Sequence, residues 1–157
     1  MVEGAYRKAL ELLARRPHFE REILAKLRNR GFQEADTEAA VRRLRDSGYL
    51  DDLRCTREFI RAKLRRSPVG RRLLRADLVR RGAAAEAIES ALSDPELESE
   101  GDLVRRAMHR WQLRRGGDKA SLMRHLDRRG FSKDDILDVA NEFGDAGRDA
   151  RRDRPRS

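Results

Sequence analysis

One cysteine and three histidines are the side chains of this chain best suited to catalysis. Cys55 could act as a nucleophile only beside a histidine, and His18, His109 and His125 all lie far from it in the sequence. None of the histidines has a second histidine at the three- or four-residue spacing of zinc sites. We therefore expect Cys55 to be a small core residue, and we expect no metal and no cofactor.

Two carboxylate pairs and one glycine-rich segment also have structural explanations. Asp51-Asp52 and Asp134-Asp135 each stand where a helix is expected to begin, and acidic side chains there stabilise the free amides and the helix dipole. The segment Gly116-Gly117-Asp118-Lys119 lacks the Lys-Ser/Thr ending and the preceding strand of a phosphate-binding loop. We conclude that the chain is not an enzyme.

Positive charge is concentrated in the middle of the chain. The whole chain has 37 Lys+Arg, 28 Asp+Glu and a formal net charge of +9. From Arg54 to Arg81 there are 11 basic residues and two acidic ones, Glu58 and Asp77, whereas the rest of the chain is balanced. The candidate binding residues are Arg61, Lys63, Arg65, Arg66, Arg71, Arg72 and Arg75.

These seven basic residues have two interpretations. Arg-rich proteins commonly carry a solvated basic helix face, which would bind nothing. Because few acidic residues in the run oppose the charge, a surface for an anionic partner is favoured. No aromatic residue lies among the seven, so base stacking is not indicated, and contact with phosphate groups or acidic protein surface is the better hypothesis.

We expect these basic residues to lie on helices, because apolar residues along the chain follow helical spacing and no segment alternates with the period of a strand. Apolar residues make up 38% of the chain and aromatic residues 5%, which favours several thin cores over one thick core. The spacing predicts nine helices, over residues 4–15, 18–30, 34–47, 52–66, 70–81, 84–93, 98–114, 118–129 and 133–143. Residues 144–157 are almost without apolar side chains and are predicted to be a disordered tail.

A six-residue pattern recurs three times at nearly equal intervals: Leu27 to Phe32, Leu78 to Ala83, and Leu126 to Phe131. Each copy begins with leucine and has glycine in its fifth position. Glycine just past a helix adopts the left-handed conformation that ends it, and the residues flanking this turn make an apolar contact. The structural residues predicted from the repeat are Gly31, Gly82 and Gly130 at the helix ends, with Leu27, Leu78 and Leu126 in equivalent buried positions.

The repeat predicts an all-α fold, an elongated array of three tandem three-helix repeats. Their predicted limits are residues 1–48, 49–95 and 96–143, and the second repeat carries the basic charge. Repeats that contact only their neighbours form extended surfaces.

The segment Gly48-Tyr49-Leu50-Asp51-Asp52, followed by Arg57-Glu58-Phe59-Ile60 and the helix ending at Gly82, resembles the RecX family of bacterial regulatory proteins. The resemblance covers roughly residues 5–143. It implies that Tyr49, Leu50, Asp51 and Asp52 belong to the scaffold. The family usually has Phe-Ala where Cys55-Thr56 stands, which implies looser local packing and a larger core role for Phe59.

The resemblance also implies a function. RecX proteins are understood to lie in the groove of the RecA recombinase filament, where they limit its growth and inhibit ATP hydrolysis, strand exchange and co-protease action. They have no known catalytic residues. The resemblance thus implies a non-enzymatic inhibitor of RecA that acts in DNA repair, DNA recombination and the SOS response, with DNA phosphate as a further contact.

The alternative is a direct DNA-binding protein, a repressor or an architectural factor, built on helix-turn-helix-like units. For either function, charge interrupts every apolar run before a bilayer could be crossed, the N-terminus lacks a signal pattern, and the single cysteine fits a reducing compartment. We expect a cytoplasmic monomer with no membrane contact.

Overall fold

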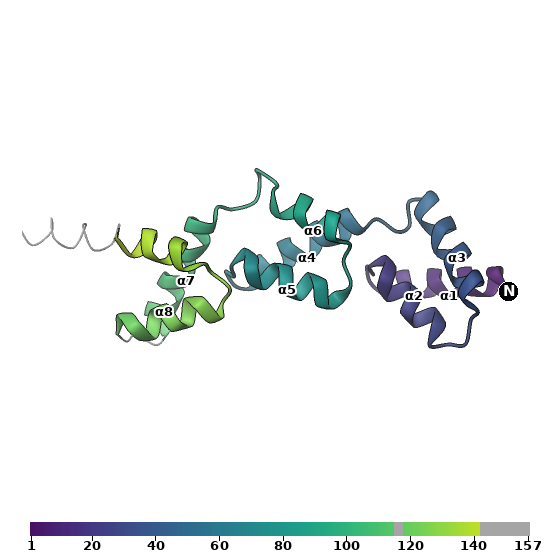
Figure 1. Ribbon diagram of the computed structural model, residues 1–157, viewed down its shortest axis with the longest axis horizontal. Helices are drawn as coiled ribbons and strands as arrows, with labels where there is room; N and C mark the ends of the chain where they lie inside the picture. Colours follow the sequence, from purple (N-terminus) through teal and green to yellow (C-terminus); the bar gives the residue numbers. More distant parts are fainter. Residues whose placement is uncertain (115–117, 142–157) are drawn as a thin grey trace, which may run out of the picture. The chain divides into compact units, whose positions relative to one another are not determined.

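The computed structural model describes residues 1–114 and 118–141, and every regular element in these ranges is an α-helix (Figure 1). The helices are α1 Val2–Leu13, α2 Glu20–Arg28, α3 Glu34–Asp46, α4 Asp52–Arg66, α5 Arg71–Arg81, α6 Ala85–Leu92, α7 Glu100–Arg114 and α8 Lys119–Arg128, followed by a helix over residues 133–141. The prediction of an all-α fold with nine helices is confirmed. Each helix end within the described residues lies no more than two residues from its predicted position. The predicted break at 115–117 and the predicted tail at 144–157 lie outside the described residues.

The chain divides into two compact units. The first holds Met1–Ala62 and Arg75–Asp94, and the second holds Lys63–Leu74 and the residues from Pro95 onward. The division passes through α4 and α5, so these two helices contribute to both units, whereas α6 lies in the first unit. The repeat limits 1–48, 49–95 and 96–143 stay predictions. None of the described helices has the length and apolar character needed to cross a membrane.

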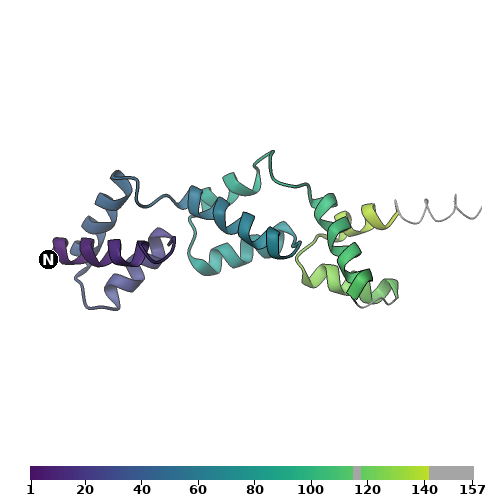
Figure 2. The same ribbon diagram turned by 180° about the vertical axis from the view of Figure 1, so that it is seen from behind.

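In the first unit, α1, α2 and α3 pack side by side around one apolar cluster, as both views show (Figures 1 and 2). The residues that close this cluster recur every three or four positions, which places them on one face of each helix. They are Ala5, Ala9, Leu12, Ile23, Leu27, Ala40, Val41, Leu44 and Leu50.

The three repeated glycines end their helices as predicted. Gly31, Gly82 and Gly130 have φ values of 83°, 89° and 86°. After each glycine, the next amide donates to the carbonyl of the repeat leucine, at 3.3 Å from Phe32 to Leu27. The same bond measures 3.0 Å from Ala83 to Leu78 and 3.3 Å from Phe131 to Leu126. All three leucines are fully buried.

Asp51 and Asp52 play different roles at the start of α4. The carboxylate of Asp51 accepts the amide of Arg54 at 2.9 Å, which is an ordinary helix cap. The carboxylate of Asp52 instead accepts the amide of Glu20 at 2.9 Å with one oxygen and the amide of Ala84 at 3.1 Å with the other. Asp52 therefore joins the first turns of α2 and α6 to α4 within the first unit.

The second unit contains an equivalent joint. Glu100, the first residue of α7, accepts the amide of Arg71, the first residue of α5, at 3.1 Å. Next to it, the amide of Gly70 donates to the carbonyl of Arg129 at 2.9 Å. Backbone approaches backbone so closely here that a Cβ on Gly70 would lie 2.6 Å from the amide nitrogen of Phe131. In both joints, a carboxylate that opens one helix holds the first amide of an earlier helix.

Candidate anion-binding surface

The C-terminal half of α4 presents arginines to solvent. α4 buries Ile60 and Leu64, so Arg61, Arg65 and Arg66 fall on its exposed side. No ion pair joins these three side chains to any residue in 1–114 or 118–141. They are therefore available to an anionic partner.

The arginines of α5 are engaged with acidic residues far away in the sequence. A terminal nitrogen of Arg71 lies 3.2 Å from Glu100, and one of Arg72 lies 2.9 Å from Asp127. Arg75 donates two hydrogen bonds to the carboxylate of Glu89, at 2.8 and 3.0 Å. For Arg71, Arg72 and Arg75, the opposing carboxylates come from α6, α7 and α8 rather than from the basic run itself, so a count of acidic residues within the run overlooks them.

The pKa directions in these pairs agree with the geometry. The hydrogen bond from Arg72 lowers the pKa of Asp127, and the bond from Arg75 lowers the pKa of Glu89. Burial is the largest influence on Glu100 and raises the pKa of its carboxyl group, although Arg71 acts in the opposite direction. Glu100 is thus the least exposed of these three carboxylates, and its pair with Arg71 is partly buried in the second unit.

The seven predicted binding residues consequently fall into two groups. Arg61, Arg65 and Arg66 are exposed on α4 and keep their charge available, while Lys63 on the same helix is half-buried. Arg71, Arg72 and Arg75 on α5 help to hold helices together. The roles of Gly70, Glu89, Glu100 and Asp127 could not be predicted from the sequence. One signal pointed to Glu100: it follows the capping residue Ser99 at the start of α7, just as Asp52 follows the capping residue Asp51 at the start of α4.

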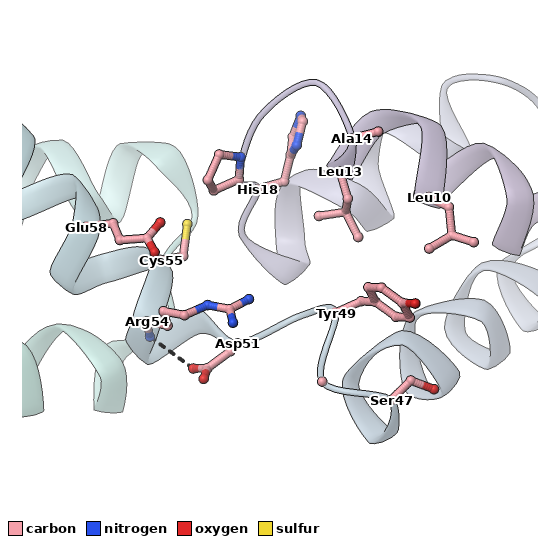
Figure 3. A pocket seen from close by; sticks show the side chains of 12 residues that line it. Leu10, Leu13, Ala14, His18, Ser47, Tyr49, Asp51, Arg54, Cys55 and Glu58 are labelled. Atoms are coloured by element: carbon pink, nitrogen blue, oxygen red, sulfur yellow. Dashed lines mark hydrogen bonds between the residues drawn. The ribbon is translucent and has the colours of Figure 1, made fainter.

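A groove of about 810 Å³ lies in the first unit, lined by α1, the loops before α2 and α4, and the first turns of α4. Figure 3 shows Leu10 and Tyr49 at one end of the groove, and Arg54, Cys55 and Glu58 at the other. The Tyr49 side chain is 55% exposed although the next residue, Leu50, is buried.

This groove brings Cys55 and His18 to the same place, which their distance in the sequence did not suggest. Burial, reinforced by the charge of Asp52, raises the pKa of the Cys55 thiol to about 11. Burial also lowers the pKa of His18, whose Nδ1 lies 2.9 Å from the carbonyl oxygen of Arg16. A thiol that stays protonated at neutral pH is a poor nucleophile, so Cys55 acts as a core residue.

The local core around Cys55 differs from the implied one. Cys55, Thr56 and Ile60 are buried, whereas Phe59 is only half-buried. The centre of the Phe59 ring lies 5.4 Å from the guanidinium carbon of Arg81. The larger core role expected for Phe59 is therefore wrong. Across residues 1–114 and 118–141, no three His, Cys, Asp or Glu side chains gather closely enough to hold a metal ion.

Comparison with known proteins decides the family. Residues 5–44 match the first three-helix domain of RecX, and residues 51–92 match its second three-helix domain. A regulatory protein RecX from Thermus thermophilus is 42% identical over 131 residues, which cover 83% of this chain and 86% of that relative. The chain belongs to the RecX family. A second RecX relative, from Chlorobium phaeobacteroides, is 30% identical over 142 residues, 88% of this chain and 93% of its own length.

Solved RecX structures share the fold. The crystal structure of RecX from Lactobacillus salivarius superposes with a TM-score of 0.79 over 90% of this chain and 95% of that chain, at 21% identity. Another RecX crystal structure gives a TM-score of 0.75, 20% identity, and coverage of 89% and 73%. Membership of this family confirms the sequence resemblance and makes the chain a regulatory protein.

Proposed function

We propose that this chain binds the RecA recombinase filament and inhibits its recombinase, ATPase and co-protease activities, and so modulates DNA repair and recombination. The observation that carries the proposal is membership of the RecX family, with both three-helix domains matched. A regulator of this kind acts through binding and needs no catalytic centre.

The exposed arginines on α4 support this proposal physically. A guanidinium presents a planar fork of N–H donors that fits the oxygens of a carboxylate or a phosphate. Arg61 and Arg65 stand four residues apart on the exposed side of α4, so both can meet one acidic surface. A DNA-bound filament offers both protein carboxylates and DNA phosphates.

Repetition along the partner also supports the proposal. A filament presents the same surface many times, and a protein built from repeated helical units can contact several copies at once. Linked weak contacts raise the overall affinity without any single strong site. Exposed arginines on one helix therefore suffice as part of a larger interface.

The test is inhibition of RecA ATPase activity on single-stranded DNA by the double variant Arg61→Glu/Arg65→Glu. Each exposed ion pair contributes up to about 1 kcal/mol, and charge reversal adds repulsion, so the inhibitory concentration should rise by at least about tenfold. The matched control is Arg7→Glu/Arg42→Glu, which reverses two exposed arginines of α1 and α3.

The control should inhibit nearly as well as the unmodified chain. If a folded Arg61→Glu/Arg65→Glu variant inhibits as strongly as the control, these arginines are not part of the interface. If the unmodified chain leaves ATP hydrolysis unaffected, the proposed function itself fails.

A further inference from the structure

A small cavity in the second unit is lined by basic side chains. Its volume is about 240 Å³, and its walls include Arg110, Trp111 and Arg114 from α7, with His125 of α8 and Arg129 directly after α8. None of its described lining residues is acidic. Pockets for drug-sized ligands span about 300–1,000 Å³, so this cavity suits a single small group.

Two of the arginines, Arg110 and Arg129, form hydrogen bonds within the protein, each through one terminal nitrogen of its guanidinium. Arg110 donates from Nη1 to the carbonyl oxygen of Arg66 at 2.9 Å, and Arg129 donates from Nη2 to that of Pro68 at 3.2 Å and to the hydroxyl of Ser67. Arg66 is the last residue of α4, whose final carbonyls lack helical partners, and Ser67 and Pro68 follow directly after it. Each guanidinium has five N–H donors.

The remaining donors have no acceptor in the described part of the chain. No hydrogen bond from Nε or Nη2 of Arg110, or from Nε or Nη1 of Arg129, ends on a residue in 1–114 or 118–141, and the same holds for the side chain of Arg114. Burial, followed by the positive charge of Arg110, lowers the pKa of Arg129. Several guanidinium groups thus converge on one cavity with N–H donors to spare.

We propose that this cavity binds a phosphate group, with Arg110, Arg114 and Arg129 as its ligands. A phosphate offers several anionic oxygens, accepts paired bonds from guanidinium groups and relieves the repulsion between neighbouring arginines. The group can come from two sources with the same chemistry, the phosphodiester backbone of a nucleic acid or free phosphate. The proposal does not depend on RecA binding and is tested without RecA.

Trp111 provides a direct readout, because it lines the cavity and is the only tryptophan of the chain. We would titrate the full chain at constant ionic strength with inorganic phosphate and, separately, with an oligothymidylate that lacks terminal phosphates, and record tryptophan emission. At least one ligand should produce a saturable change. Saturation by the oligonucleotide alone identifies the backbone diester, and saturation by inorganic phosphate alone identifies free phosphate.

The variants Arg110→Gln and Arg114→Gln should each weaken that binding by at least about tenfold. The control Arg128→Gln removes an exposed arginine outside the cavity and should change the affinity less than about twofold. If Arg110→Gln does not fold, because it loses the bond to Arg66, the exposed Arg114 decides the question. The proposal would be overturned if tryptophan emission changed with neither ligand, or if sodium chloride produced the same change. It would also be overturned if the variants bound the ligand as tightly as the unmodified chain.

Discussion

Among the described glycines, Gly70 is the one at which an added Cβ would come closest to another atom, 2.1 Å from the carbonyl oxygen of Gly130. Its amide donates to the carbonyl of Arg129, and its α-carbon packs against the backbone of Gly130 and Phe131. Gly130 is also constrained, because a Cβ there would lie 2.4 Å from the Cβ of Leu73 and because its φ of 86° favours glycine. Any side chain at position 70 must therefore push apart the start of α5 and the end of α8.

We predict that Gly70→Ala lowers the free energy of unfolding by on the order of 3 kcal/mol, because the added methyl group overlaps rigid backbone. Chemical denaturation followed by circular dichroism measures the loss. Gly101→Ala is the control: it lies inside α7, its Cβ would meet nothing closer than 3.6 Å, and alanine favours the helix. A Gly70→Ala variant as stable as Gly101→Ala would show that the contact is not tight.

The limits of sequence reasoning at this scale are set by distance along the chain. The repeat hexamer is local, so the left-handed glycines and the buried leucines could be predicted from it. The partners of the α5 arginines could not, because Arg72 meets Asp127 and Arg71 meets Glu100 only after several helices have packed. For the same reason, the sequence could not predict that His18 and Cys55 line one groove.

At the scale of elements, the two carboxylate joints explain how one helix fixes the next. Asp52 opens α4 and holds the first amide of α2, and Glu100 opens α7 and holds the first amide of α5. The first amides of a helix have no partner within it, so a carboxylate from a neighbouring element satisfies them and also favours the positive end of the dipole. Helix lengths could be predicted from apolar spacing, but these joints depend on packing.

We predict that Asp52→Ala destabilises the fold by about 2 kcal/mol, because it strips acceptors from the amides of Glu20 and Ala84 on two other helices. The matched variant Asp51→Ala removes one ordinary cap and should cost about 1 kcal/mol. Urea denaturation of both variants gives the comparison. Equal losses, or a larger loss for Asp51→Ala, would show that Asp52 acts only within its own helix.

At the scale of the whole molecule, the excess positive charge lies between Arg54 and Arg81. In the structure, some of these basic side chains form ion pairs and others are exposed at the surface. Arg71, Arg72 and Arg75 of α5 pair with carboxylates of other helices. Arg61, Arg65 and Arg66 remain at the surface of α4. The net charge alone therefore overstates the binding surface. A smaller basic surface would give weaker attraction to bare DNA and leave more of the affinity to protein contacts.

The proposed function requires that the partner is the RecA filament rather than DNA itself. Its most direct test is the affinity of the full chain for single-stranded DNA coated with RecA and for the same DNA uncoated, each at two salt concentrations. We predict binding to coated DNA at least about ten times tighter at both concentrations, because protein contacts lose less affinity with salt than phosphate contacts do. Equal affinity for coated and bare DNA would contradict the claim and favour a direct DNA-binding protein.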